Sequence, residues 1–170
     1  VYKDFSLNSL SFHSEMKSSS SYSSGFMNLK FEQGKWKSEV FDSGTLDISF
    51  SKNRVIFENC HFKSGDDYLL ISGSWLSNNK YKIDRIQSAY KDNYLVNSKP
   101  IFINYQDTSV SIEPFEIHIN DGILDGVLSI GSFSEGRFKM SNFNANVITQ
   151  FVDSKYLDLS GIIFGEIAFN

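Results

Sequence analysis

The side chains of this 170-residue chain that could do chemistry are few and scattered. His13, His61 and His118 are the three histidines, and Cys60 is the single cysteine. A zinc site needs three or four such ligands at set spacings, and we assign none of the histidines a partner ligand or carboxylate. His61 follows Cys60 directly, but neighbouring residues of a strand face opposite sides and do not easily share a metal. We expect all three histidines to be structural or solvated.

Carboxylates and aromatic rings are the remaining candidates. Asn120-Asp121-Gly122 followed by Asp125-Gly126 faintly resembles a calcium loop, but the ligand spacing and the final Glu are missing, and two turns are the better interpretation. The sequence has no glycine-rich phosphate loop, Gly-x-Ser-x-Gly elbow or Cys-x-x-Cys motif. Trp36, Trp75 and the eight tyrosines could form a carbohydrate platform, although aromatic residues at alternating strand positions belong more often to a core. We interpret the protein as not an enzyme, with no metal and no cofactor.

Composition narrows the class of partner. The formal net charge is -4 and the isoelectric point is about 5.3, and Lys residues are spread singly, which argues against nucleic acid. The longest apolar runs are short, such as Tyr68-Leu69-Leu70-Ile71, so none predicts a membrane-spanning helix. We expect one domain over residues 1–170. Both ends look cut, and we interpret the chain as a piece of a larger protein.

Alternation of apolar and polar residues dominates the chain and predicts antiparallel strands with one wet face. Met27, Leu29 and Phe31, for example, alternate with Asn28 and Lys30. Turn-forming residues recur at short intervals, which indicates an all-β meander of roughly a dozen strands. The expected turns are Gln33-Gly34-Lys35, Asp42-Ser43-Gly44, Ser64-Gly65-Asp66, Ser77-Asn78-Asn79, Asn120-Asp121-Gly122 and Ser134-Glu135-Gly136.

Two segments depart from this alternation. Residues 18–24 are almost all Ser and are interpreted as a flexible loop. Val147, Ile148, Phe151 and Val152 fall on one face of a helix, so we expect a short helix near residues 146–153, covering an open end or edge of the sheet.

One irregular spacing recurs: two apolar residues two apart, a gap of three, and two more. In a flat strand the second pair would point to the opposite face, whereas a bulge between the pairs restores the face and bends the strand. Bends in neighbouring strands would curl the whole sheet. The copies are Phe5, Leu7, Leu10, Phe12; Val55, Phe57, Cys60, Phe62; Val110, Ile112, Phe115, Ile117; Phe138, Met140, Phe143, Ala145; and, in part, Tyr81, Ile83, Ile86.

A Pro-led strand, Lys99-Pro100-Ile101-Phe102-Ile103, is followed by strands with the pattern apolar-x-Gly-x-apolar. Leu124-Asp125-Gly126-Val127-Leu128 carries that pattern, and Ile71-Ser72-Gly73-Ser74-Trp75 looks like an earlier copy. With these features, the stretch from about Val55 to the end resembles the repeating unit of the TamB family, within the wider AsmA-like group.

The resemblance implies a curled antiparallel sheet, or β-taco, forming an open groove with an apolar interior. TamB-like proteins are anchored in the bacterial inner membrane, cross the periplasm, and are linked to phospholipid movement and to outer-membrane protein assembly with a BamA-type or TamA-type partner. We interpret the chain as a segment without the anchor and the C-terminal end of that family, so we do not expect partner binding at the outer membrane to carry over to it.

We therefore expect an all-β groove whose apolar face holds phospholipid acyl chains as a segment of a conduit between the two membranes. Exposed apolar surface of this extent generally marks a binding function. The residues expected to line the groove are Leu46, Ile48, Phe50, Phe57, Ile112, Phe115, Ile117, Leu128, Ile130, Phe138 and Met140.

Two alternatives stay open at this point. The same groove could act as a chaperone for unfolded outer-membrane strands, which would pair with open sheet edges. The chain could also be a closed β-sandwich that serves as an adhesin or a carbohydrate-binding module, because a sandwich uses the same alternation.

Overall fold

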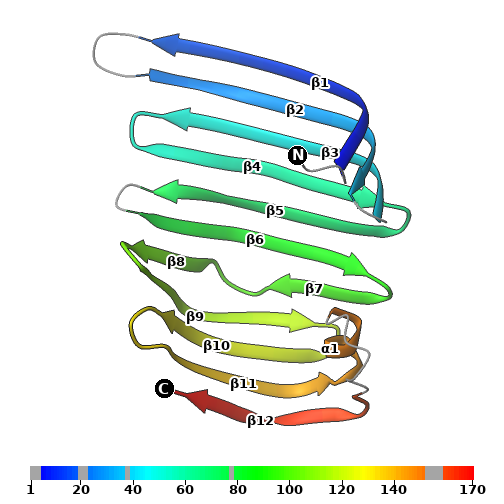
Figure 1. Ribbon diagram of the computed structural model, residues 1–170, viewed down its shortest axis with the longest axis vertical. Helices are drawn as coiled ribbons and strands as arrows, with labels where there is room; N and C mark the ends of the chain where they lie inside the picture. Colours follow the sequence, from blue (N-terminus) through cyan, green and yellow to red (C-terminus); the bar gives the residue numbers. More distant parts are fainter. Residues whose placement is uncertain (1–4, 19–22, 37–38, 77–78, 152–158) are drawn as a thin grey trace.

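The computed structural model describes residues 5–18, 23–36, 39–76, 79–151 and 159–170. In these ranges the chain forms twelve strands, all in one antiparallel sheet, and one short helix (Figure 1), which confirms the predicted all-β class. The elements are β1 (Phe5–Ser18), β2 (Ser23–Trp36), β3 (Glu39–Ser51), β4 (Arg54–Ser64), β5 (Asp67–Leu76), β6 (Lys80–Tyr90), β7 (Asn93–Asn97), β8 (Ile101–Gln106), β9 (Ser109–Ile119), β10 (Gly122–Ile130), β11 (Glu135–Asn144), α1 (Asn146–Phe151) and β12 (Ile162–Phe169).

The sheet is a meander in which each strand pairs with the next one along the chain, except around β7 and β8. These two strands share one position between β6 and β9, and both pair with each neighbour. The break between them includes Pro100, which has no N–H to donate to a ladder. Asn97 closes the gap: its Oδ1 accepts a bond from the backbone N–H of Ile86 at 2.6 Å, and its Nδ2 donates to the carbonyl of Lys99 at 2.8 Å.

Bulges occur where the repeated spacing predicts them in four of the five segments. The register shifts between Phe57 and Cys60 on β4 and between Met140 and Phe143 on β11. The shifts opposite the β6 and β9 segments fall between Ser72 and Gly73 and between Gly126 and Leu128. In each case the extra residues keep both apolar pairs on one face of the sheet.

In the β1 segment, the apolar pairs stay on one face of the sheet without a register shift. Its register with β2 is not shifted, but Gln33 on β2 has a positive φ of 55°. Leu7 and Phe31 side-chain carbons both lie 3.0 Å from the point where a Cβ on Gly34 would sit. Leu7 pairs with Gly34 and Leu10 pairs with Phe31, so both leucines lie on the same face without a register shift.

Two expected turns and part of the expected loop are wrong, and a third turn, Ser134-Glu135-Gly136, is displaced, because Glu135 and Gly136 already belong to β11. Gln33-Gly34-Lys35 lies inside β2 and Asp42-Ser43-Gly44 lies inside β3. Gly44 leaves room for the Phe31 ring, so these glycines serve packing inside long strands rather than chain reversal. In the serine-rich stretch, Ser18 ends β1 and Ser23 begins β2, while residues 19–22 lie outside the described ranges.

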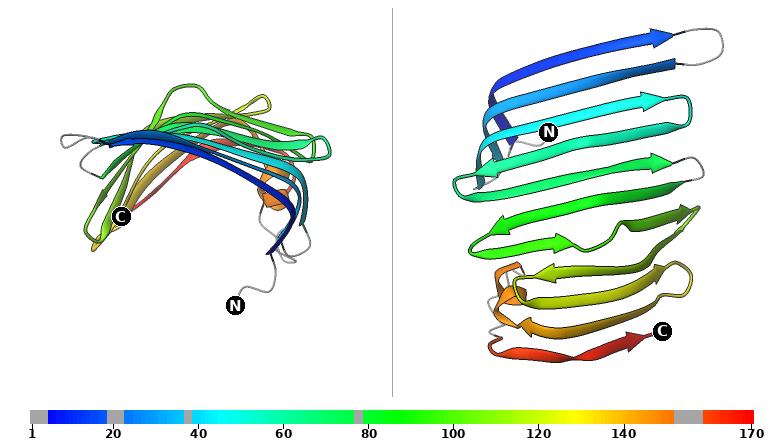
Figure 2. Two further views of the ribbon diagram at one scale, coloured as in Figure 1. Left: turned by 90° about the horizontal axis from the view of Figure 1, so that it is seen from above. Right: turned by 180° about the vertical axis from the view of Figure 1, so that it is seen from behind.

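The strands are arched, and the helix lies on the inner side of the arch, as the view from above in Figure 2 shows. Helix α1 spans Asn146–Phe151, close to the predicted 146–153, of which residues 152 and 153 are outside the described ranges. It covers part of one face of the sheet rather than an edge, since Val147 packs with Ile119 and Phe143. We call this inner side the concave face.

Candidate functional site

Apolar side chains on the concave face line up in rows that cross the strands. In an antiparallel pair, directly opposed residues lie on the same face, so the strand register identifies each row. We describe three of these rows and call them rows 2, 3 and 4. The longest is row 4, which crosses eleven strands without interruption. Every step in row 4 is a direct pairing between neighbouring strands. Row 4 consists of Met16, Gly25, Phe50, Val55, Trp75, Tyr81, Ile103, Ile112, Leu128, Gly136 and Phe169.

Two further rows, row 3 and row 2, run beside row 4. Row 2 has two parts, and Asn97 joins them. Row 3 contains Met27, Ile48, Phe57, Gly73, Ile83 and Ile101, and then Phe115, Gly126, Phe138 and Ile167. Row 2 contains Phe12, Leu29, Leu46, Cys60, Ile71 and Ile86, and then Ile117, Leu124 and Met140.

The structure brings all eleven predicted groove residues to this one face. Row 2 holds three of them, row 3 four and row 4 three, as the pairings above show. Ile130 lies just beyond row 4, opposite Val110 and two residues after Leu128. The spacing could reveal this placement because each bulge offsets the alternation by one residue and so preserves the face.

Glycines in the rows make room for aromatic rings. A Cβ at Gly126 would lie 2.6 Å from the Phe115 ring and 2.8 Å from the Phe138 ring, which belong to the neighbouring strands of row 3. Those two rings lie with centroids 6.3 Å apart, and Phe138 stacks on Phe169 with centroids 6.2 Å apart. The apolar-x-Gly-x-apolar pattern therefore lets large side chains lie flat across a neighbouring strand.

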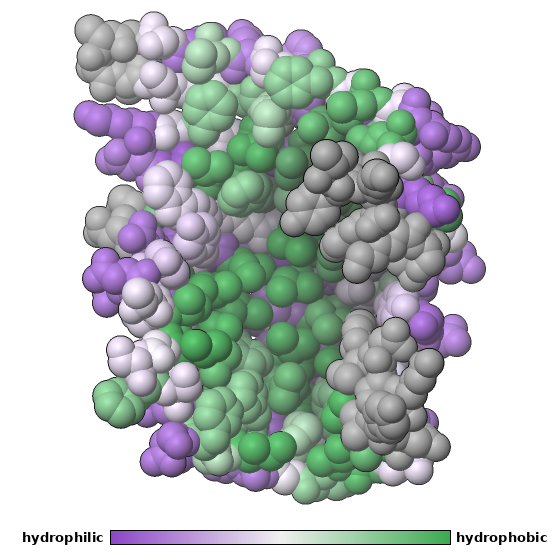
Figure 3. Space-filling model, in the orientation of Figure 1, coloured by the Kyte–Doolittle hydropathy of each residue, from purple (hydrophilic) through white to green (hydrophobic). Residues whose placement is uncertain are grey.

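The concave face is covered to different extents along its length. Across the ends of β9–β12, Val147 of α1 packs on Ile119 and Phe143, and the partly buried row 2 residues Ile117 and Met140 pack against this cluster. Across β1, Leu10, Phe12 and Met16 are 57%, 61% and 70% exposed. Figure 3, which looks onto this face, shows hydrophobic residues gathered over its middle and hydrophilic residues along both rims.

The opposite, convex face carries polar side chains and ion pairs. Asn59 donates to Asp47 at 3.2 Å and Asn28 bonds the same carboxylate, so three neighbouring strands are tied together. Lys80 pairs with Glu113 at 2.7 Å. A sheet with one polar and one apolar face normally buries the apolar face against another layer. Within the described ranges, α1 is the only element that does so.

Sequence reasoning missed one pair of titratable side chains. Glu116 stands two residues before His118, so the two share the convex face, and His118 Nε2 lies 2.9 Å from Glu116 Oε1. Hydrogen bonds from Ser98 and then from His118 lower the pKa of Glu116. The i, i+2 spacing was the available signal. The pair lies on an open strand surface, and it has the geometry of a surface ion pair rather than of a catalytic dyad.

Cys60 lies in row 2 of the concave face, opposite Leu46 and Ile71, while its neighbour His61 contacts Tyr68 on the other face. Burial, and then the charge of Asp47, raise the pKa of the Cys60 thiol, which favours the unreactive protonated form. Among the described residues, no three His, Cys, Asp or Glu side chains are grouped to hold a metal ion.

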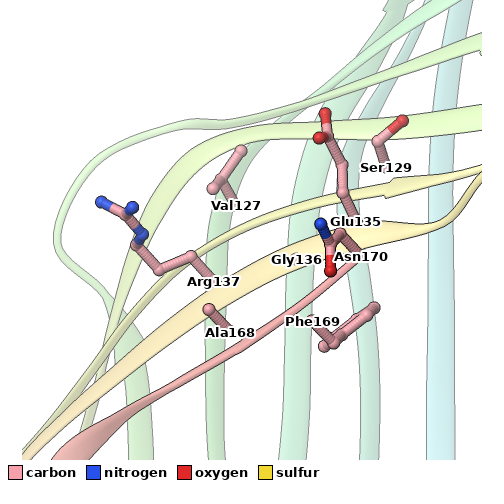
Figure 4. Close-up of a pocket in the computed structure, with 8 residues that line it drawn as sticks. All are labelled: Val127, Ser129, Glu135, Gly136, Arg137, Ala168, Phe169 and Asn170. Atoms are coloured by element: carbon pink, nitrogen blue, oxygen red, sulfur yellow. The ribbon is translucent and has the colours of Figure 1, made fainter.

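An open hollow of about 470 Å³ lies between the ends of β10, β11 and β12 (Figure 4). Ser129 and Glu135 point to one side of it and Phe169 to the other. The Arg137 guanidinium, which also lines it, is engaged by Glu166 at 3.2 Å. The hollow lacks a nucleophile paired with a base, so we assign it no chemistry.

Comparison with known proteins adds no relative. No family model matches the chain, and neither a curated protein nor a solved structure matches it. The resemblance to the TamB family stays a prediction, and the concave face itself has to carry the argument about function. Within the described ranges, no helix combines the length and the apolar character needed to cross a bilayer.

Proposed function

We propose that the concave face carries the acyl chains of lipids along the rows, as a segment of a longer conduit. The observation that carries the proposal is row 4, in which apolar residues or glycines follow one another across eleven strand positions from Met16 to Phe169. A catalytic pocket would concentrate polar groups at one point, whereas row 4 is continuous in one direction and consists of apolar residues and glycines.

The dimensions of the face suit acyl chains. Neighbouring strands lie about 4.8 Å apart, so eleven strand positions span about 50 Å. The hydrocarbon core of a bilayer is about 30 Å thick, which allots about 15 Å to the chains of one leaflet. About three lipids placed end to end would therefore cover the rows.

The energetics also favour an apolar occupant. Burying one Ile or Phe side chain contributes about 1.5–3 kcal/mol relative to leaving it in water. Phe12, Met16 and Ile130 remain about half exposed or more, so much of that free energy is not realised in the isolated sheet. Acyl chains supply apolar contact without requiring directional hydrogen bonds, which matches the predominance of apolar side chains in the rows.

The setting of this activity is part of the proposal and rests on the resemblance to the TamB family. The parent protein would be anchored in the bacterial inner membrane, with this segment in the periplasm, and phospholipids would move along it in support of outer-membrane biogenesis. An outer-membrane partner of the BamA or TamA type would bind through other parts of that protein.

The experiment places a photo-crosslinking amino acid at position 112 and, as the matched control, at position 111. Ile112 belongs to row 4, whereas Ser111 pairs with Asn104 on the convex face. After irradiation in living cells, lipid adducts at 112 and not at 111 are expected.

Other outcomes of this experiment separate the rival functions. Adducts with an outer-membrane β-barrel protein at 112, without lipid, would favour a chaperone surface for unfolded strands. Equal labelling at both positions, or no adduct at either one, would overturn the acyl-chain proposal. The single sheet already differs from the two packed layers that a closed sandwich adhesin requires.

A further inference from the structure

Glycines inside the strands of the concave face pair with phenylalanines on neighbouring strands. A ring can lie over a directly opposed glycine because no Cβ occupies that space. Gly122 differs, but it is the first residue of β10 and pairs with Ile119. The direct pairs are Gly25 with Phe50, Gly34 with Phe41, Gly44 with Phe31 and Phe62, Gly73 with Phe57, Gly126 with Phe115 and Phe138, and Gly136 with Phe169.

Gly165, within β12, departs from this pairing. Its direct partner is Met140 on β11, and a Cβ at Gly165 would meet no atom within 4 Å. A Cβ at Gly25, by contrast, would lie 2.8 Å from the Phe50 ring. Among the described residues, no strand pairs with the outer side of β12. Gly165 therefore offers a seat for an aromatic ring, and the strand that would bring the ring is missing.

The edge formed by β12 has little protection against pairing with another strand. Sheet edges are usually protected by charged residues, proline or bulges. The single charged side chain of β12 is Glu166, and Arg137 of the neighbouring strand engages it at 3.2 Å. Phe164 and Ile167 are 70% and 56% exposed. The opposite edge, β1, carries both Glu15 and Lys17, so β12 is the edge better suited to accept a strand.

The sequence of β12 is complementary to itself about Ile167. Gly165 lies two residues before Ile167, and Phe169 lies two residues after it. If two antiparallel copies of β12 pair with Ile167 opposite Ile167, Gly165 of each copy lies opposite Phe169 of the other copy. Both empty seats are then filled at once, as a symmetric interface requires.

Phe169 remains available for this second contact. Its ring lies 2.6 Å from the point where a Cβ on Gly136 would sit, yet the side chain is 45% exposed. One ring can serve two glycines, since the Phe138 ring lies 2.8 Å from such a point on Gly126 and 3.2 Å from that on Gly136. The paired segment, residues 164–170, also lies away from α1, which is at the other end of β12 (Figure 1).

We propose that two copies of this chain associate through their β12 strands, in the antiparallel register centred on Ile167. The two concave faces then lie on the same side of one larger sheet, because directly opposed residues share a face. Row 3, which ends at Ile167, continues into row 3 of the second copy. The inference goes beyond the proposed function, since it holds whatever molecule occupies the concave face.

The test measures the molar mass of the full chain against its concentration by sedimentation equilibrium, without lipid or detergent. A reversible dimer is expected. Ile167→Lys and Ile167→Glu should each weaken dimerisation by at least about tenfold, because like charges then stand directly opposite each other. An equimolar mixture of these two variants should restore a one-to-one dimer, since residue 167 meets residue 167 of the other copy.

Two further variants isolate the edge and the register. Phe12→Lys makes the same change of charge at a residue of similar exposure on the β1 edge, and it should leave the dimer unchanged. Gly165→Val should weaken dimerisation by about tenfold, because its branched side chain fills the seat of the Phe169 ring. A general attraction between apolar edges would instead be strengthened by the added valine. Circular dichroism verifies that each variant keeps its strands.

The contrary outcomes are specific. A chain that stays monomeric up to its solubility limit overturns the proposal. A dimer that Phe12→Lys disrupts and Ile167→Lys does not would join β1 edges, and larger assemblies sensitive to both variants would join β12 to β1; either result refutes the β12 pairing. A Lys and Glu mixture that remains monomeric, or a Gly165→Val dimer that is tighter, refutes the register. Lipid crosslinking at position 112 is unaffected by any of these results.

Discussion

Strands β1–β6 and strands β9–β12 present the same apolar rows, and they differ in what lies over them. On β1, Leu10, Phe12 and Met16 are 57%, 61% and 70% exposed. Where α1 packs on the sheet, Phe143 of β11 and Val147 of α1 are 5% and 3% exposed. Nothing in the alternation of residues separates the two regions. Around Ile119 and Phe143, a six-residue helix between β11 and β12 makes the difference.

The comparison shows that an apolar row on one face of the sheet needs a covering group before its side chains are buried. At the β9–β12 end the chain supplies the covering group itself, and row 2 becomes part of a packed cluster with Val147 and Ile148. At the β1–β6 end the same kind of surface lacks a covering layer within the described ranges. That end is therefore where an external occupant would contribute the most free energy.

The largest expected effect comes from placing a charge in each region. Val147→Asp would bury an unpaired carboxylate between α1 and the sheet and should lower the free energy of unfolding by about 3 kcal/mol or more. Phe12→Asp, on the open end, should cost less than about 1 kcal/mol, because its side chain already meets water. Urea denaturation measures both changes, and equal losses would break the distinction between a covered and an open end.

A smaller effect is expected from the glycine rows and tests packing that does not involve the helix. Gly126→Ala places a Cβ against the Phe115 and Phe138 rings and should destabilise the sheet by about 1–3 kcal/mol. Gly165→Ala, in row 2 on β12, meets no atom within 4 Å and should change stability by less than about 0.5 kcal/mol. Thermal unfolding compares the two variants. A neutral Gly126→Ala would mean that the rings do not rest on this glycine.

The smallest effect concerns the junction between the two regions. Glu113 on β9 accepts bonds from Lys80 on β6 at 2.7 Å and from Asn104 on β8 at 3.3 Å, and these bonds lower the pKa of Glu113. Since its folded pKa lies below its unfolded value, ionised Glu113 stabilises the fold above the unfolded pKa, and this contribution is lost as the pH falls through the folded value.

Glu113→Gln should therefore flatten the acid side of the stability profile slightly, since the carboxylate is exposed and solvent screens it. The measurement is the midpoint of thermal unfolding against pH for the unaltered chain, for Glu113→Gln and for Glu32→Gln on β2 as the control carboxylate. Identical acid profiles for all three proteins would show that the β6–β9 contact does not couple the regions.

Much of the fold was predictable because its signals are local. The period of two predicts strands, and the gap of three between apolar pairs predicts bulges, as on β4 at Phe57 and Cys60. The helix was also predictable, from the spacing of Val147 and Ile148 with later apolar residues. Gly34 and Gly44 misled the prediction of turns, since a glycine that makes room for a ring has the same sequence signature as a glycine that reverses the chain.

The sequence by itself determined that the strands have one apolar and one polar face, because side-chain direction alternates with each residue and each bulge offsets the count by one. It also predicted that eleven named side chains, from Leu46 to Met140, share the apolar face. Only the tertiary structure decided that the strands form one sheet rather than two packed layers, that α1 lies over Ile119 and Phe143, and that Glu116 reaches His118. Those outcomes depend on which distant segments meet, and the pattern within any one strand is the same whichever layer covers it.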